Sequence, residues 1–316
     1  MASSPHKYNG ILLIDKTTGM TSHDVVQKIR RHLGMRRIGH TGTLDPNATG
    51  LLVVCLGNAT KVVQFLTDSD KEYEAEIYLG MSSVTFDAEG IDDTQRPAEV
   101  PDLDPTDLEQ LLADFRGTIQ QVVPAYSAVH VNGRRLHEMA RKGEDVQPPT
   151  REVEISSITV SEFDKPFLRL LVRCSSGTYI RSLAHDIGQK LGCGAYLSNL
   201  RRTSIGIHSV DDALTLEDLP SLVQTEQLQS HMLGIGQVLN FAAFTVSDAF
   251  RPRVLMGSDL HKDNILAVEG TFAKGDEVLL KDSAGSVLAV GHAQVSVAKL
   301  AASHNETLFS YIRVLN

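Results

Sequence analysis

The sequence has 316 residues, which is enough for two compact units, one large and one small. Its 42% hydrophobic and 22% charged residues are typical of a globular chain and exclude wholesale disorder. The 30 basic and 39 acidic residues give a formal charge of −9, which argues against a nucleic-acid partner unless the charges are segregated.

The charges are in fact segregated along the sequence. Acidic side chains gather between residues 87 and 109, whereas basic side chains gather at residues 28–37, at residues 134–142, and at Arg201 with Arg202. Phosphate binding depends on the local field of a surface and not on net charge, so these clusters are compatible with a basic RNA face. By themselves they are equally typical of solvated helix faces.

Apolar runs and cysteines narrow the class of protein further. The longest apolar run, residues 51–56, is too short to span a bilayer, and residues 1–10 lack the apolar segment of a signal peptide. We therefore expect a cytoplasmic protein without a membrane segment. Cys55, Cys174 and Cys193 form no C-x-x-C pair, which argues against a disulfide framework or a zinc site and favours buried free thiols.

The first elements are marked by an apolar run and by capping residues. Residues 11–14 predict a buried strand. The sequence Thr21-Ser22-His23-Asp24 is a capping box, so we expect a helix to begin there and to end at Gly34. The basic side chains expected on the solvent side of this helix are Lys28, Arg30 and Arg31.

The middle of the sequence predicts strands and two further helices. Residues 71–79 alternate between apolar and charged, which indicates a strand with Tyr73 turned inward. An apolar stripe after Pro105 predicts a helix that stops at Gly117. Residues 153–160 and 167–173 indicate strands. A turn at 175–178 then leads into a helix that Gly192 closes.

After about residue 240 the sequence pattern changes from mixed helices and strands to short strands separated by turns. Residues 276–280 and 287–290 flank a turn at 282–285 and predict a hairpin in a small all-β unit. We place the two units at 1–240 and 241–316. Within the first unit, residues 122–150 combine Pro, Gly and basic residues as a mobile substrate-binding loop would.

Chemistry is concentrated in one loop. The sequence contains no P-loop, G-x-G-x-x-G, H-E-x-x-H or G-x-S-x-G motif, so nucleotide-binding, zinc-peptidase and serine-hydrolase functions lose support. Residues 39–50, GHTGTLDPNATG, hold the densest set of Gly and Thr, which permit close approach of backbone to a ligand. Asp45 lies in the middle, before a proline. Taken alone, an Asp-Pro pair is typical of a turn.

This loop resembles a family signature. Residues 42–50 match in full the G-x-L-D-P-x-A-x-G loop of the TruB family of tRNA pseudouridine synthases. Other motifs similar to those of that family occur before and after this loop, in the same order along the chain: GILLIDK (10–16), GMTS (19–22), KEY (71–73), PAYSA (124–128), NG (132–133), GTYIRSL (177–183) and LRRT (200–203). The departures are Thr17, where the family usually has Pro, and Ser83-Val84-Thr85, where it has Thr-x-Thr.

The resemblance covers residues 10 to about 205, and the last unit resembles the PUA module that accompanies the family. It implies an α+β fold, with a mixed, largely antiparallel sheet and flanking helices, followed by a small β-barrel PUA-like RNA-binding domain. It also implies isomerisation of uridine to pseudouridine, at uridine 55 in the T arm of tRNA. The reaction involves no redox change, so no cofactor, nucleotide or metal is expected. The expected partner is tRNA, bound by a monomer.

The resemblance also implies catalytic roles. Asp45 is the nucleophile, although neither the sequence nor the resemblance decides between attack on uracil C6 and on the ribose carbon. Arg181 pairs with Asp45 and keeps its carboxylate ionised. Tyr73 stacks on the target base and helps to take the C5 proton, with a plain core tyrosine as the alternative.

Five further residues are implied to contact the substrate or to support the loop. Ile180 and Leu200 resemble apolar walls of a dry base pocket, or are plain core. A uridine inside a folded arm must be flipped out, and His40 resembles the residue that fills the vacated space. Tyr179 resembles a substrate contact, with helix capping as the alternative. Lys16 fits support of the active-site loop better than chemistry.

Two other functions remain open. A guide-RNA-dependent synthase acting on ribosomal RNA shares these motifs and the PUA module, but such proteins commonly carry basic tails. This sequence has none, which favours a free-standing tRNA enzyme. In an RNA-folding chaperone or binding protein, Asp45 would be incidental.

Overall fold

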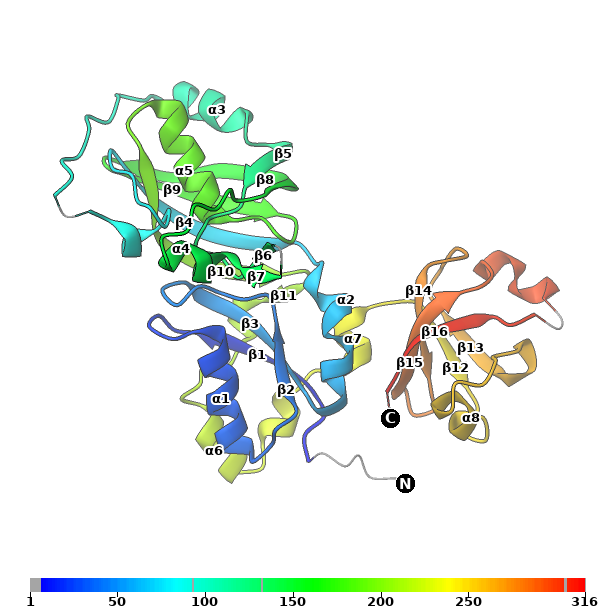
Figure 1. The fold of residues 1–316 in the computed structure, drawn as a ribbon. Helices are drawn as coiled ribbons and strands as arrows, with labels where there is room; N and C mark the ends of the chain where they lie inside the picture. The colour runs from blue at the N-terminus through cyan, green and yellow to red at the C-terminus, as the bar shows by residue number, and fades with distance from the viewer. Residues whose placement is uncertain (1–6, 93, 132, 304–305, 316) are drawn as a thin grey trace.

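The computed structural model describes residues 7–92, 94–131, 133–303 and 306–315, so Asn132 of the NG motif lies outside it. In this part of the chain a nine-stranded sheet and its helices form the larger body, and a five-stranded sheet forms a smaller body beside it (Figure 1). The expected α+β class is confirmed. No described helix is both long and apolar enough to cross a membrane. The three cysteines are buried and free, as expected.

The large sheet consists of two antiparallel halves. Its order is β1-β3-β10-β4-β9-β8-β5, with β2 on β3 and β11 on β10. The strands are β1 (Gly10–Lys16), β2 (Ile38–Thr41), β3 (Thr49–Leu56), β4 (Lys71–Leu79), β5 (Gly117–Val122), β8 (Thr150–Asp164), β9 (Phe167–Cys174), β10 (Ala195–Ile205) and β11 (His208–Ser209). The halves meet where β3 and β10 run parallel over two residue pairs, Thr49 with Arg201 and Gly50 with Arg202.

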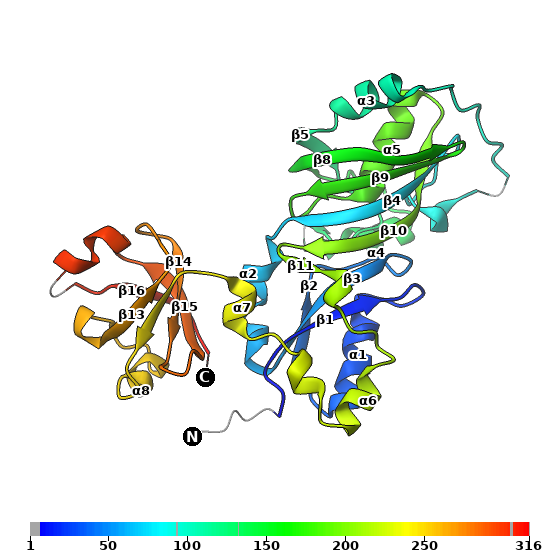
Figure 2. The ribbon, with the colours of Figure 1, turned by 180° about the vertical axis from the view of Figure 1, so that it is seen from behind.

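Most helices lie against the large sheet or at its ends, and the last one lies on the smaller sheet, as Figure 2 shows from behind. The longer ones are α1 (Ser22–Leu33), α3 (Pro105–Ala113) and α5 (Ile180–Leu191). The shorter ones are α2 (Val63–Thr67), α4 (Leu136–Arg141), α6 (Leu219–Gln224), α7 (Ile235–Leu239) and α8 (Arg251–Leu255). Short 3-10 helices occupy residues 57–62, 88–90, 210–212, 228–231, 262–264 and 297–302.

The capping box predicted for α1 is confirmed. The Thr21 side chain accepts from the Asp24 amide, and Gly34 ends the helix in the left-handed conformation at φ +63°. The solvent position predicted for Arg30 is wrong. Its side chain is half-buried, because its guanidinium reaches β2 and donates to the Ile38 carbonyl at 2.8 Å.

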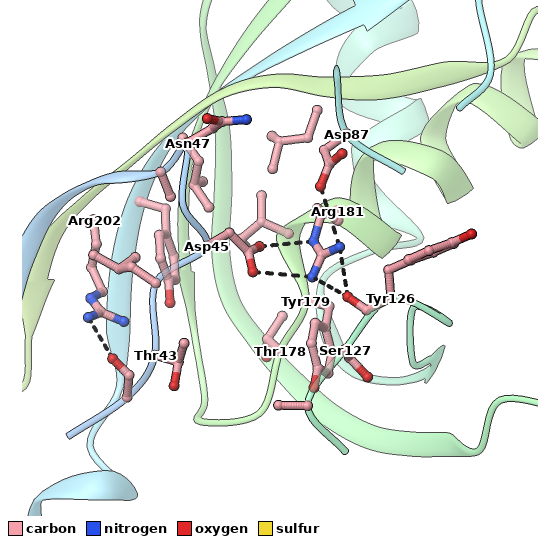
Figure 3. Close-up of a pocket in the computed structure, with 18 of the residues that line it drawn as sticks. Thr43, Asp45, Asn47, Asp87, Tyr126, Ser127, Thr178, Tyr179, Arg181 and Arg202 are labelled. Carbon is pink, nitrogen blue, oxygen red and sulfur yellow. Dashed lines mark hydrogen bonds and ion pairs between the residues drawn. The ribbon is translucent and has the colours of Figure 1, made fainter. Parts of the chain in front are cut away.

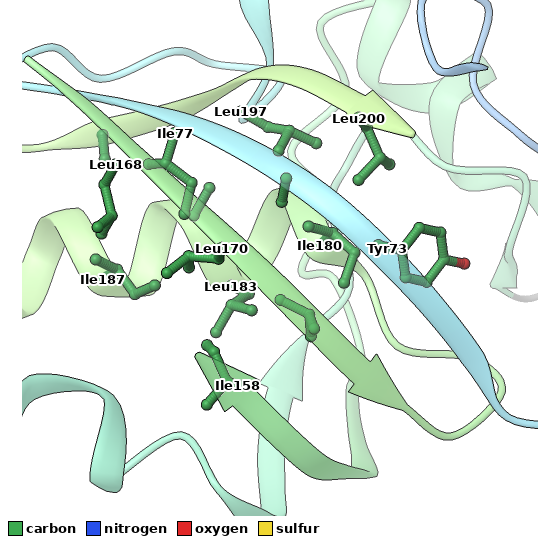
Figure 4. Close-up of a cluster of buried hydrophobic side chains, with 14 of the residues drawn as sticks. Tyr73, Ile77, Ile158, Leu168, Leu170, Ile180, Leu183, Ile187, Leu197 and Leu200 are labelled. Carbon is green, nitrogen blue, oxygen red and sulfur yellow. The ribbon is translucent and has the colours of Figure 1, made fainter. Parts of the chain in front are cut away.

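Helix α5 packs on the apolar face of β4, β9 and β10 (Figure 4). Its buried residues Ile180, Leu183 and Ile187 follow the predicted stripe, and Gly192 caps it as predicted. The predicted end of α3 is wrong: the helix stops at Ala113 and Gly117 opens β5. Phe115 continues the apolar spacing but packs on the core from the turn after the helix.

The predicted hairpin is confirmed near the C-terminus. Strands β14 (Glu277–Lys281) and β15 (Val287–Ala293) pair antiparallel. The other strands of this sheet are β12 (Ala243–Val246), β13 (Ile265–Glu269) and β16 (Phe309–Val314). One buried cluster joins both bodies, since Leu279, Val290 and Leu315 pack with Val238 and Leu239. The boundary at 240/241 stays a prediction.

The segment 122–150 carries its own small elements. Strands β6 (His130–Val131) and β7 (Arg134–Arg135) form a two-stranded sheet ahead of α4. Arg134 is paired with Glu144 at 2.7 Å. Arg141 and Lys142, at the end of α4, have exposed side chains. Arg134 and Arg135 are exposed as well, but each is paired with an acidic side chain, Glu144 at 2.7 Å or Glu138 at 3.9 Å, whereas no ion pair of Arg141 or Lys142 is found among the described residues.

Candidate active site

A cavity of about 1400 Å³ lies where the two halves of the sheet meet. The loop 42–49 reaches it from the first half, and β4, β10 and the start of α5 line it from the second. Six of the eight residues singled out from the sequence line the cavity: Asp45, Tyr73, Tyr179, Ile180, Arg181 and Leu200. Lys16 and His40 do not line it.

Asp45 and Arg181 form a two-point ion pair across the boundary between the halves (Figure 3). Arg181 Nε lies 2.9 Å from Asp45 Oδ2, and Nη2 lies 3.3 Å from Oδ1. The Arg181 side chain is only 7% exposed, whereas that of Asp45 is 43% exposed. The guanidinium is thus held inside the protein, and the carboxylate is open to a ligand.

The remaining donors of Arg181 are fixed by two other loops. Nη1 donates to the Thr85 carbonyl at 3.2 Å and lies 3.4 Å from Asp87 Oδ2. Both Nη atoms lie 3.2 Å from the Tyr126 carbonyl. A guanidinium with five donors in a fixed fork is suited to such a set of acceptors.

Asp87 and Tyr126 were missed as site residues in the sequence. Asp87 was grouped with acids away from the RNA face, yet it lines the cavity. The available signals were the Ser83-Val84-Thr85 motif directly before Asp87 and the PAYSA motif that contains Tyr126. Neither motif revealed that its residues meet one guanidinium.

Two opposing influences act on the Asp45 carboxyl. Although 43% of the side chain is exposed, it lies inside a cavity walled by protein, and this burial raises the pKa of Asp45. Arg181 is the largest influence that lowers the pKa, and Asp87 raises it further. The carboxyl is therefore harder to ionise than a free aspartate, and Arg181 is the group that most favours its charge.

Lys16 supports the backbone of the loop that carries Asp45. This side chain is fully buried, and its Nζ donates to the carbonyls of Met20 at 2.8 Å and Pro46 at 3.0 Å. Burial lowers the pKa of Lys16 to about 8, and the Asp45 charge opposes that change. Ser22 Oγ accepts from the Leu44 amide at 2.9 Å. Lys16 thus fixes backbone rather than lining the cavity.

The two halves of the sheet meet at a seam, the parallel pairing of β3 with β10, where Gly50 lies beside Arg202. Gly50 has φ +101°, and a Cβ there would lie 2.2 Å from the Arg202 carbonyl oxygen, so only glycine fits. The buried Arg202 donates to the carbonyls of Leu51 at 2.8 Å and Gly42 at 3.0 Å. The placement of Arg202 in a basic surface cluster is therefore wrong, whereas Arg201 is partly exposed. Arg202 is internal, and Arg201 is paired at 2.8 Å with Asp15.

The apolar wall of the cavity is formed by Tyr73, Ile180 and Leu200. They are 8%, 4% and 9% exposed, line the cavity and also belong to the core cluster around α5, so their positions are compatible with both the pocket and the core interpretation. Figure 4 shows the Tyr73 hydroxyl pointing away from the labelled core side chains. Burial raises the pKa of Tyr73, and Arg202 is the largest influence that lowers it.

Tyr179 and His40 are placed differently. Tyr179 precedes α5, and the buried Gln121 binds both its backbone groups, at 2.7 Å to the amide and 3.0 Å to the carbonyl. The Tyr179 side chain makes no cap hydrogen bond and instead lines the cavity. His40 lies on β2 outside the cavity, and burial lowers its pKa.

Three segments of the chain match known families. Residues 30–180 match the TruB family pseudouridylate synthase (N terminal domain). Residues 181–240 match the tRNA pseudouridylate synthase B C-terminal domain, and residues 243–306 match the PUA domain. Among the residues that the structure describes, no group of three or more His, Cys, Asp or Glu lies so as to hold a metal ion.

Similar proteins cover nearly the whole chain. The tRNA pseudouridine synthase B of Bacillus licheniformis is 40% identical over 90% of this chain and 92% of its own length. That of Syntrophus aciditrophicus is 40% identical over 93% and 94%. Among solved structures, an H/ACA RNP bound to a substrate RNA containing 2'-deoxyuridine has a TM-score of 0.76 and 26% identity over 97% of this chain and 85% of the matched one. A Cbf5-Nop10-Gar1 complex has a TM-score of 0.75 and 28% identity over 97% and 85%. Because the fold, the signature loop and the relatives at 40% identity all indicate the same family, the chain belongs to the TruB family of pseudouridylate synthases, which are isomerases.

Proposed function

We propose that this enzyme converts uridine 55 in the T arm of tRNA to pseudouridine, as a cytoplasmic monomer, with Asp45 as its nucleophile. The observation that carries the proposal is the pair of Asp45 and Arg181 in the cavity at the seam, on the signature loop of the family. The relatives at 40% identity are named tRNA pseudouridine synthase B, which supports tRNA as the substrate.

The reaction needs a carboxylate but no change of oxidation state. The bond from uracil N1 to the ribose breaks, the base turns, C5 joins the same sugar carbon, and the C5 proton leaves while N1 takes up a proton. Asp45 either adds to uracil C6 or captures the sugar carbon, and both routes need it ionised. Arg181 favours that charge and fixes the carboxylate by two points of contact.

The cavity is suited to a nucleotide turned out of its helix. Tyr73, Ile180 and Leu200 offer apolar surface to a base, and Tyr179 adds a second aromatic ring to the lining of the cavity. His40 lies outside the cavity, which fits a residue that occupies the place vacated by the flipped base. In this proposal the PUA-like domain (241–316) and the segment 122–150 bind other parts of the tRNA.

A guide-RNA-dependent synthase is the second candidate, because the H/ACA protein structures match the fold over 97% of the chain. The test is release of tritium from C5-labelled uridine in unmodified tRNA by this protein alone, followed by mapping of the product. Release without any guide RNA, at position 55, would support the proposal. A requirement for added guide RNA, or a product at other positions alone, would contradict it.

We predict a steep salt dependence of tRNA binding in spite of the net charge of −9. Arg141, which lines the cavity, and Lys142 have exposed side chains and are placed to displace counterions. Arg141→Glu with Lys142→Glu should weaken binding and flatten the dependence of log Kd on log salt between about 50 mM and about 200 mM. Filter binding or fluorescence anisotropy measures both quantities.

A matched reversal serves as the control for this experiment. Lys165→Glu with Lys190→Glu also reverses two charges, at exposed ion pairs with Asp102 and Asp114 beyond the cavity. Such surface pairs contribute little to stability. If both double variants change the salt slope equally, or if the wild-type affinity hardly changes with salt, the basic RNA face does not lie at the end of α4.

Tyr73→Phe should leave tRNA binding intact and slow turnover. The ring that would stack on the base remains, whereas the hydroxyl that would help to remove the C5 proton is lost. We expect a single-turnover rate lower by about 100-fold, as for loss of a general base. An unchanged rate at saturating enzyme would leave Tyr73 as a stacking or core residue only.

A further inference from the structure

The loop 83–90, which carries Asp87, is held in an unusual backbone conformation. Phe86, directly before Asp87, has φ +64°, in the left-handed region that bulky residues rarely adopt. Such a residue persists only where its surroundings fix it, and a strained residue beside a site is a reason to look for a role there. At Phe86, the surroundings come from α5 and β10.

The Phe86 ring is stacked on His185. Their ring centroids lie 4.0 Å apart with an angle of 17° between the planes. His185 follows Arg181 by four residues on α5, so both side chains leave the same face of the helix. The helix therefore contacts this loop twice, through Arg181 at Thr85 and Asp87 and through His185 at Phe86.

Few other contacts fix the loop relative to Arg181. Thr85 Oγ1 donates to Asp87 Oδ1 at 2.5 Å and the Glu89 amide donates to it at 3.0 Å, but both bonds lie within the loop and would move with it. The Leu197 amide of β10 donates to the Phe86 carbonyl at 3.0 Å. The Phe86 amide also donates to the Ser83 carbonyl at 3.2 Å within the loop, and Asn47 Nδ2 donates to Glu89 Oε1 at 2.9 Å further along it. The ring of His185 is the side-chain contact that opposes relaxation of φ at Phe86 itself, and relaxation there turns the next residue, Asp87.

We propose that His185 is a positioning residue for the reaction: stacked on Phe86, it fixes Asp87 against Arg181 and thereby orients the guanidinium toward Asp45. The inference rests on the proposed function, because it assumes that Asp45 and Arg181 act together in the reaction. Neither His185 nor Phe86 lines the cavity, so His185 acts through its neighbours and does not touch the base.

The state of the His185 ring is consistent with this role. Its Nδ1 is buried and has no hydrogen-bond partner among the described residues. Burial lowers the pKa of His185, so the ring is neutral near pH 7. A neutral ring stacks on Phe86 without placing a second cation one helical turn from Arg181.

The test compares His185→Ala with His185→Phe, which keeps a flat ring. At saturating enzyme, His185→Ala should slow single-turnover tritium release about 10-fold, while tRNA Kd stays within about twofold, because only the geometry of the reacting groups changes. His185→Phe should restore most of the rate. Gln189→Ala is the matched control. Gln189 lies one turn after His185 on α5, but its side chain is exposed, so this substitution should leave the rate unchanged.

A double variant separates positioning from a general packing role. If His185 acts through Asp87, then His185→Ala should slow the Asp87→Asn enzyme by less than about twofold, because the link is already broken. Multiplicative losses in the double variant, a wild-type rate in His185→Ala, or no rescue by His185→Phe would each overturn the proposal. An inactive wild-type enzyme, or an active Asp45→Asn enzyme, would instead refute the proposed function.

Discussion

Asp45→Asn is expected to abolish pseudouridine formation while tRNA affinity stays near that of the wild type. Asparagine keeps the shape and most hydrogen bonds of the side chain but removes the charge and nearly all nucleophilicity, so the rate should fall by at least about 10,000-fold. Phosphate and stacking contacts do not involve the carboxylate, so binding should survive. Product formation is measured by tritium release and affinity by filter binding.

The fold should tolerate this substitution. Burial raises the pKa of Asp45 above its unfolded value, so the charged form opposes folding, increasingly as pH rises through the folded-state pKa. A neutral side chain removes that opposition, although Arg181 loses its partner. Asp15→Asn is a matched control, since Asp15 forms a similar two-point pair with Arg201 outside the cavity. A folded Asp45→Asn enzyme that still isomerises uridine at an appreciable rate would refute Asp45 as nucleophile.

Arg181→Lys should be the second most damaging change. Lysine keeps the positive charge but cannot reproduce the two-point contact with Asp45 or the bonds to the carbonyls of Thr85 and Tyr126. We expect a fall in the single-turnover rate of about 100-fold or more, with unchanged tRNA affinity.

The pH profile gives a second readout for Arg181. The reaction needs ionised Asp45, so the rate falls as pH drops through its pKa, which burial places above the ordinary value of about 3.9. Arg181 lowers that pKa by its charge and by its hydrogen bonds; lysine keeps the charge but loses the two-point contact, so Arg181→Lys should move the acid limb to higher pH. Arg201→Lys, which alters the pair with Asp15, should not move it. An acid limb that stays in place in Arg181→Lys would show that the two-point contact of Arg181 does not lower the pKa of Asp45.

Local sequence patterns predicted the elements that make the site. The capping box at Thr21, the alternation around Tyr73 and the stripe on α5 each depend on neighbours in the chain, and each is confirmed. The resemblance in the loop 42–50 identified Asp45, and residues 42–49 of that loop line the cavity. Roles for the individual side chains remain proposals.

Contacts between residues far apart in the chain could not be predicted from local sequence patterns. Arg202 was counted with Arg201 as a basic cluster of a possible RNA face, but pairing of β10 with β3 buries it against Gly50. Asp87 belongs to an acidic stretch, and only the packing of α5 on the sheet brings it to Arg181. Likewise, nothing local to His185 indicates a ring partner 99 positions earlier in the chain, at Phe86.

The buried cluster between the two bodies limits what can be learned by shortening the protein. A chain cut after residue 240 would lose Leu279, Val290 and Leu315 and leave Val238 and Leu239 facing water. Exposed apolar surface of this kind promotes aggregation. Poor yield or inactivity of such a fragment would therefore report on solubility, and the part played by the C-terminal sheet in RNA recognition is better addressed by substitutions on its outer strand β13, where Leu266 is 62% exposed.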